Sequence, residues 1–322
     1  SGASVRLLNG NRGRISLTDI KKWINPKDDV HYPLTQLVSL EDTTNRGGGA
    51  LYDFEEIKKI RSFTNEMGLP LHLDGARAMN GIAARNMDPK TYASQFDSIS
   101  ICLSKGLGAP VGSLLIGSKD FIYKARRIRK VFGGGMRQVG FMAAAGKYAL
   151  ENNVLKLNID RDKALKIEKQ LQDIDWVEYI YPVQTNIVIF VLKEKEKRDL
   201  LIQKLEEKEI LTIPFGEGMI RMVTHLDLSF EMIDFVCKEL KKLTRTEGQI
   251  LIKLIHRETG QTVFKLVKEL RNGFRAFSYN SLAKLFDISI KVEYEPETID
   301  EDAIIEDVLK RAYADKTIKL AL

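Results

Sequence analysis

Apolar and polar positions along the first half of the chain follow a pattern that predicts strands and helices in alternation. The helical pattern is clearest at residues 54–68, where apolar side chains recur at the spacing of one helix face and Gly68 marks the end. Residues 120–132 predict a second helix, with a basic face. Short apolar runs predict strands at residues 35–42, 69–74, 96–104 and 112–118. Strands connected through helices predict a largely parallel sheet covered by helices.

The second half of the chain predicts a smaller α+β domain followed by an extension. Helical and strand patterns alternate at residues 154–174, 185–193, 197–210, 219–225 and 229–243, the last an amphipathic helix. We therefore expect a large domain at residues 1–153, a small domain at 154–243 and an appended region at 244–322. In the appended region we expect short helices that stop at Gly260 and Gly273, so that the extension is mostly helical.

Composition excludes several classes of protein. The 322 residues are 44% hydrophobic without a long apolar run, which predicts a soluble chain that does not span a membrane. The net charge of +6 is spread over helix-like segments, so we expect no nucleic-acid partner. Cys102 and Cys237 match no metal or redox spacing and predict two buried thiols in a reducing, cytoplasmic compartment. Residues 293–307 hold eight acids and no base, yet their spacing matches no calcium loop, and we expect no metal site.

Two residues stand out as candidates for chemistry. Asp74 ends one predicted strand and Lys105 follows the next, which places both at the carboxyl edge of a parallel sheet, where ligands collect. Lys105 is the only charge in a stretch of small and apolar residues. A lysine amine can hold the aldehyde carbon of pyridoxal phosphate, and a carboxylate can keep its ring nitrogen protonated. An ordinary buried salt bridge between the two is the alternative at this point.

Three arginines are further candidates. Arg221 lies in an apolar strand, where burial is costly unless a carboxylate meets the guanidinium group; a structural salt bridge is the alternative. Arg137 follows three glycines that could carry one cation to a phosphate, or could form a basic surface turn. Arg77 follows Asp74 closely, and by itself it is indistinguishable from a solvated arginine. We expect His72 and His225 to be structural.

At residues 71–80 (LHLDGARAMN), 98–118 (SISICLSKGLGAPVGSLLIGS) and 129–150 (RKVFGGGMRQVGFMAAAGKYAL) the sequence resembles L-threonine aldolases. The resemblance runs from residue 2 to residue 243. It implies a large domain with the aspartate-aminotransferase fold, fold type I, and pyridoxal phosphate as cofactor.

The resemblance also implies a role for each candidate residue. Lys105 would form the internal aldimine, and Asp74 would pair with the pyridine nitrogen. Arg77 would lie near the phenolic oxygen of the cofactor and the substrate. Arg137 would reach the cofactor phosphate of a neighbouring subunit, and Arg221 would bind the substrate carboxylate.

The implied reaction is retro-aldol cleavage of L-threonine or L-allo-threonine to glycine and acetaldehyde, in threonine catabolism and glycine biosynthesis. The implied assembly is a homotetramer, a dimer of dimers, and the implied small-molecule partner is the amino-acid substrate. Two alternatives stay open. One is another fold-type-I lyase or transaminase, and the other is a truncated, non-catalytic fusion chain.

The sequence departs from the family pattern in three places. Residues 41–45 read EDTTN where the family has Glu-Asn-Thr-His-Asn. The match begins after the family's glycine-rich phosphate cradle and its stacking histidine, so we expect a large domain that is incomplete at its N-terminus and binds its cofactor weakly. Residues 244–322 resemble a small uncharacterised bacterial family instead, and the junction near Leu243 is either a gene fusion or a rearrangement.

Overall fold

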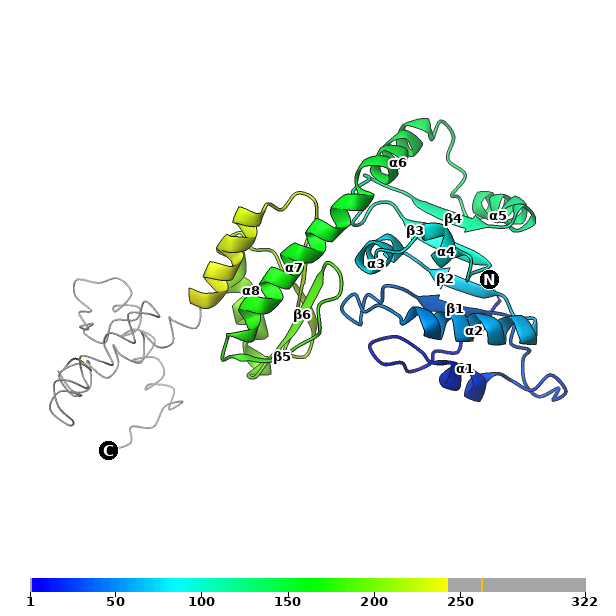
Figure 1. Cartoon of the computed structure of the whole chain (residues 1–322), viewed down its shortest axis with the longest axis horizontal. Coiled ribbons are helices and arrows are strands. Elements are labelled where there is room, and N and C mark those ends of the chain that lie inside the picture. The colour runs from blue at the N-terminus through cyan, green and yellow to red at the C-terminus, as the bar shows by residue number, and fades with distance from the viewer. Residues whose placement is uncertain (1, 243–261, 263–322) are drawn as a thin grey trace. The chain divides into compact units, whose positions relative to one another are not determined.

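The computed structural model describes residues 2–242 and residue 262. Its first sheet, within that part of the chain, has four strands in the order β1-β2-β3-β4. The strands are β1 (Val38–Glu41), β2 (Leu71–Asp74), β3 (Ser98–Cys102) and β4 (Ser113–Gly117). The first three run parallel, so β1, β2 and β3 end at one edge of the sheet, as their alternation with helices predicts (Figure 1).

The two faces of this sheet differ in polarity. Side chains alternate along each strand, so Leu71 and Leu73 lie on one face of β2, while His72 and Asp74 lie on the other. The apolar face packs into one buried cluster together with Ile57 and Ile60 of α2 (Phe54–Met67) and Tyr92 of α4 (Pro89–Ala93). The polar face, which carries Asp74, is therefore free to present chemistry at the edge of the sheet.

Local capping signals fix the helices of this region. Asp53 accepts a hydrogen bond from the backbone N–H of Glu55 at the start of α2, and Gly68 ends that helix in the left-handed conformation, with φ of 66°. Ser16 and Asp19 form a capping box at the start of α1 (Leu17–Trp23). The short α3 (Ala78–Arg85) begins directly after Arg77.

The fourth strand runs antiparallel to β3, so the sheet is largely parallel, as expected, with one antiparallel strand at its edge. The connection at residues 103–112 contains no helix, and a parallel return needs a crossover of a dozen residues or more. The two strands therefore form a hairpin-like pair, and its connection carries Lys105.

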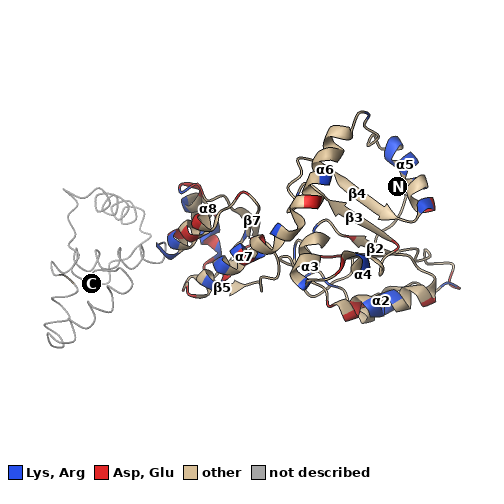
Figure 2. Ribbon diagram, turned by 45° about the horizontal axis from the view of Figure 1, so that its top comes forward, with Lys and Arg blue, Asp and Glu red and all other residues tan. Residues whose placement is uncertain are grey.

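From β4 to residue 152, few side chains are buried. β4 is exposed along its whole length, and α5 (Lys119–Val131) buries none of its residues. Figure 2 shows lysine and arginine along α5. The following α6 (Gly140–Asn152) buries only Gly146 and Ala149. Large apolar side chains with more than half of their surface exposed gather on α5, α6 and the loop between them: Ile128, Val131, Phe132, Met136, Phe141 and Tyr148.

A second sheet follows, antiparallel throughout, in the order β5-β6-β8-β7. Its strands are β5 (Val177–Ile180), β6 (Ile187–Leu192), β7 (Ile213–Gly216) and β8 (Met219–Val223). The 3-10 turn η1 (Val154–Lys156) leads into the long α7 (Leu157–Gln172), which packs on α3 and on β5 and β6 (Figure 1). A second 3-10 turn, η2 (Lys195–Lys197), precedes α8 (Arg198–Glu206), and residues 230–242 form a last described helix. The strands and helices of this layer lie within residues 154–242, and the domain bounds expected from the sequence stay a prediction.

The chain divides into two compact units, Ser1–Cys237 and Lys238–Leu322. The helices expected near Gly260 and Gly273 and the acidic residues 293–307 lie outside the described residues. Among the described helices, none combines the length and the apolar character that crossing a membrane would require.

Candidate active site

Asp74 is the last residue of β2, on the polar face of the sheet. It pairs in register with Glu41 of β1 on one side and with Ser100 of β3 on the other. Its side chain is exposed, and Oδ1 accepts a hydrogen bond from the backbone N–H of Ala76 at 3.1 Å. The carboxylate is thus held at the sheet edge without a cationic partner within 4.0 Å in the described part of the chain.

Lys105 lies in the connection between β3 and β4, with an exposed side chain. The turn is held by its backbone, because the N–H of Gly108 donates to the carbonyl of Lys105 at 2.8 Å. A Cβ at Gly106 would come within 3.0 Å of Asn80 Oδ1 and 3.1 Å of Leu157, so a larger residue would press this loop against side chains of α3 and α7. The glycine beside Lys105 therefore eases the close packing of the loop.

Arg77 lies at the N-cap of α3, half-buried. Burial lowers the pKa of its guanidinium group, and the nearby charges of Glu41 and Asp74 act in the opposite direction. None of the ion pairs formed by the described residues involves it. Sequence alone could not separate this arginine from a solvated one, but the structure places it partly out of water and unpaired beside Asp74.

Arg221 lies in the middle of β8, opposite Ile189 of β6. Its Nε is buried and has no hydrogen-bond partner, and the guanidinium carbon lies 5.6 Å from the centre of the Phe215 ring. Burial lowers the pKa of Arg221, and the positive charge of Arg77 lowers it further. Arg77 and Arg221 thus come from different sheets, form no ion pair with the described acids, and share an electrostatic interaction that an anion would relieve.

Arg137 is placed differently. It lies in the exposed loop between α5 and α6, and within the described residues no hydrogen bond or ion pair connects it to Asp74, Arg77 or Lys105. The expectation that it reaches a phosphate in a neighbouring subunit stays a prediction.

Cys102 corrects one expectation from the sequence. Cys237 is buried, but Cys102 is only half-buried, because it ends β3 on the polar face opposite the exposed Ser113. Burial alone would raise the pKa of the Cys102 thiol. The hydrogen bond with Ser104, at 3.4 Å, and the charge of Lys105 outweigh this effect, so the pKa falls below its usual value. Both cysteines are free thiols.

The histidines and the EDTTN segment have structural contacts. His72 Nδ1 lies 2.8 Å from Ser98 Oγ, and burial lowers the pKa of the ring. The buried carboxylate of Asp42 accepts hydrogen bonds from Arg85 and Tyr92. Burial raises the pKa of Asp42, although the charge of Arg85 partly offsets this effect. The hydroxyl of Thr44 donates to the carbonyl of Arg12 at 2.8 Å, at the position where the family pattern has histidine.

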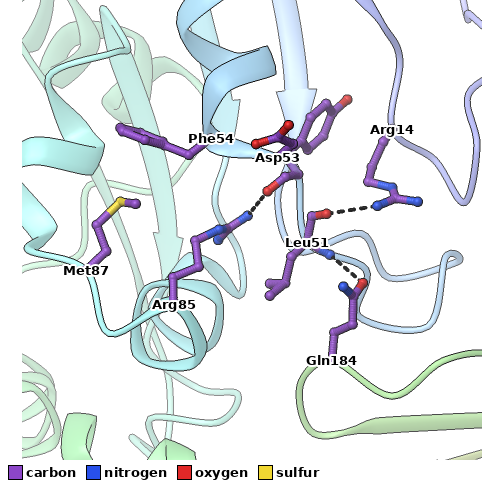
Figure 3. A pocket seen from close by; sticks show the side chains of 8 residues that line it. Arg14, Leu51, Asp53, Phe54, Arg85, Met87 and Gln184 are labelled. Carbon is purple, nitrogen blue, oxygen red and sulfur yellow. Dashed lines mark hydrogen bonds between the residues drawn. The ribbon is translucent and has the colours of Figure 1, made fainter.

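A hollow among the described residues lies elsewhere. It measures about 490 Å³ and is lined by residues that include Arg14, Arg85 and Gln184 (Figure 3). Arg14 donates to the carbonyl of Leu51 at 3.0 Å, and Arg85 donates to the carbonyl of Tyr52 at 2.7 Å. Because both arginines hold backbone, this hollow has a structural character.

The fold defines a class, the fold-type-I enzymes that depend on pyridoxal phosphate. Two solved structures share this fold. A threonine aldolase from Leishmania major is 21% identical with a TM-score of 0.64, covering 76% of this chain and 71% of that one. A serine palmitoyltransferase from Sphingomonas wittichii is 16% identical with a TM-score of 0.56, covering 72% and 60%.

Within this class, the chain belongs to the beta-eliminating lyase family, whose model matches residues 1–195. The low-specificity L-threonine aldolase of Escherichia coli (strain K12) is 41% identical over 221 residues, which are 69% of this chain and 64% of that protein. The Candida albicans enzyme of the same name is 36% identical over 236 residues, 73% of this chain and 61% of that protein. The chain therefore spans somewhat less than two thirds of these relatives. Residues 228–311 match a domain of unknown function.

The residues at the sheet edge fit the cofactor of this family. An exposed lysine amine lies in a loop whose neighbouring glycine allows close packing, and a carboxylate lies on the adjacent strand. The buried Arg221 Nε lacks a hydrogen-bond partner, and neither arginine forms an ion pair with a described acid, so two cations remain available to the anionic groups of a ligand. The donor set matches what pyridoxal phosphate and an amino acid require.

Proposed function

We propose that this chain carries the catalytic residues of a low-specificity L-threonine aldolase, which cleaves L-threonine or L-allo-threonine to glycine and acetaldehyde. The observation that carries the proposal is the pairing of Arg77 and Arg221. Both guanidinium groups are partly buried, neither forms an ion pair with a described acid, and the charge of Arg77, which lies near Glu41 and Asp74, acts on Arg221. An amino-acid carboxylate is the anion that such a pair would bind.

Each residue then has one task. Arg221 binds the substrate carboxylate with its planar fork, and Arg77 adds a second positive charge. Lys105 holds the cofactor aldehyde carbon through its amine, and Asp74 keeps a proton on the ring nitrogen. When bound, pyridoxal phosphate supplies an electron sink for the pair released as the bond between the α and β carbons breaks.

We also propose a homo-oligomer, a dimer of dimers, in which a second copy covers the exposed face of α5 and α6. The support is the concentration of exposed apolar side chains there, because monomeric proteins seldom leave such patches uncovered. Arg137, on the same face, would then reach the cofactor phosphate of the neighbouring subunit. The free cysteines favour a cytoplasmic location, and the reaction would serve threonine catabolism and glycine formation.

The test measures glycine and acetaldehyde formed from L-threonine by the full chain with added pyridoxal phosphate. We expect equal amounts of both products, loss of turnover in Lys105→Ala, and no effect of Lys90→Ala, a matched exposed lysine on α4. Arg221→Lys should raise KM for L-threonine roughly tenfold to a hundredfold, because a charged hydrogen bond contributes about 1.5–3 kcal/mol. Formation of a keto acid instead would favour a transaminase of the same fold, and absence of any product would favour a non-catalytic chain.

A further inference from the structure

A chain of buried polar residues connects α3 with the end of β8. Asn80 Nδ2 donates to Asn186 Oδ1 at 3.3 Å, and Asn186 Nδ2 donates to the carbonyl of Thr224 at 2.9 Å. The hydroxyl of Thr224 donates to the carbonyl of Asp160 in α7 at 2.6 Å. The exposed fractions of Asn80, Asn186 and Thr224 are 6%, 3% and 1%. Buried amides without partners are costly, so these hydrogen bonds favour one arrangement of the elements that carry them.

At one end of this chain of contacts, Asn80 meets the backbone of Arg77 and the residue after Lys105. Asn80 lies in the first turn of α3, and its backbone N–H donates to the carbonyl of Arg77 at 3.0 Å. Its side chain packs against Gly106, the residue after Lys105, where a Cβ would come within 3.0 Å of Oδ1. Asn80 is therefore in contact with the backbone of Arg77 and lies against Gly106, next to Lys105.

The other end fixes the strand that carries Arg221. Ile187 pairs with Val223 and Ile189 pairs with Arg221, so β6 and β8 form a regular antiparallel ladder. Asn186 extends that ladder by one residue, because its carbonyl accepts the backbone N–H of Thr224 at 3.0 Å. Its side-chain amide then binds the Thr224 carbonyl as well. Thr224, which follows the last residue of β8 and lies three residues beyond Arg221, is thus held by two hydrogen bonds to Asn186.

We propose that Asn80 and Asn186 are positioning residues that set the spacing between Arg77 and Arg221 and so shape the carboxylate site. The inference deepens the proposed function and rests on it. The two guanidinium groups repel each other, and a directional hydrogen bond between the elements that carry them opposes their separation. Apolar side chains of similar shape would fill the same space, but they would form no directional hydrogen bond between α3 and the strands β6 and β8.

The first experiment needs no cofactor or substrate. Hydrogen exchange of the full chain is compared between wild type, Asn80→Leu, Asn186→Leu and Thr64→Val. Thr64 is the matched control, because it is fully buried on α2 and its hydroxyl donates only to the carbonyl of Arg61. We expect backbone amides of residues 219–224 to exchange at least tenfold faster in both asparagine variants, with β2 unchanged. Unchanged exchange at 219–224 in folded variants would overturn the proposed spacing role.

The second experiment separates positioning from stability. Binding of glycine and of glycinamide to the cofactor-loaded chain is measured at a temperature where every variant is folded. Asn80→Leu and Asn186→Leu should weaken glycine binding at least tenfold and glycinamide binding less than twofold, since only glycine has a carboxylate. An equal loss for both ligands would refute positioning. If either variant fails to fold, Thr224→Val provides a milder break, since it removes the hydroxyl bond to Asp160 at nearly constant shape.

The two proposals fail in different ways. A wild-type chain that binds glycine no better than glycinamide contradicts the proposed function, and hydrogen exchange at residues 219–224 then still decides whether Asn80 and Asn186 hold β8. A wild-type chain that prefers glycine, with variants that keep this preference, leaves the function standing and overturns the positioning role.

Discussion

Asp74 and Lys105 lie at the same edge of one sheet, and the proposed role of the Asp74 carboxylate can be tested by removing its charge. Asp74→Asn keeps the size of the side chain but removes the negative charge that would hold a proton on the cofactor ring. We expect cofactor still to bind, with an absorption change on addition, while turnover of L-threonine falls by orders of magnitude. Asp88→Asn, at the N-cap of α4, is the control and should leave turnover unchanged. Near-normal activity in Asp74→Asn would assign that residue another role.

Cys102 offers a residue-scale test that requires no catalysis. Its thiol pKa lies below the usual value, whereas burial raises the pKa of Cys237. Since the thiolate is the reactive form, iodoacetamide should label Cys102 much faster than Cys237 at neutral pH in the cofactor-free chain, as read by mass spectrometry. The pH midpoint of Cys102 labelling should rise in Lys105→Met, because the positive charge that favours the thiolate is lost. Equal labelling of both cysteines would contradict this electrostatic account.

Helix α5 has a sequence with apolar side chains, yet it lies exposed on the surface. It is capped at Ser118 and regular over 13 residues, yet none of its side chains is buried. If a second copy covers it, Ile128→Glu combined with Phe132→Glu should shift the chain to a smaller species in sedimentation velocity. Leu211→Glu, which alters an equally exposed apolar residue after α8, should not. An unchanged assembly in the double variant would exclude this face as the interface.

For the whole molecule, the question is whether the appended region, residues 244–322, contributes to the stability of the rest of the chain. The two buried clusters around the first sheet draw on residues between Ile20 and Leu157, and the family match ends at residue 195. Deleting residues 244–322 should therefore change the melting temperature by only a few degrees. Differential scanning calorimetry of the full and shortened chains gives the measurement. A large fall would show that the two units unfold as one cooperative system.

Much of the fold could be predicted because it depends on local sequence. The helix at 54–67 follows from its apolar spacing, the cap at Asp53 and the stop at Gly68. The direction of β4 could not be predicted from its apolar run, since strand periodicity is the same for parallel and antiparallel strands. The missing crossover helix in residues 103–112 was the signal that could have identified it.

By itself, the sequence determined that Asp74 and Lys105 share an edge, because parallel strands bring their carboxyl ends together. Only the tertiary structure decided that Arg221 approaches Arg77, that Asn80 meets Asn186, and that Cys102 stays partly exposed. Each of these facts joins segments far apart in the chain. Such contacts depend on how sheets and helices pack against each other. The periodicity of a single segment predicts which of its faces is buried, but not which distant segment packs on that face.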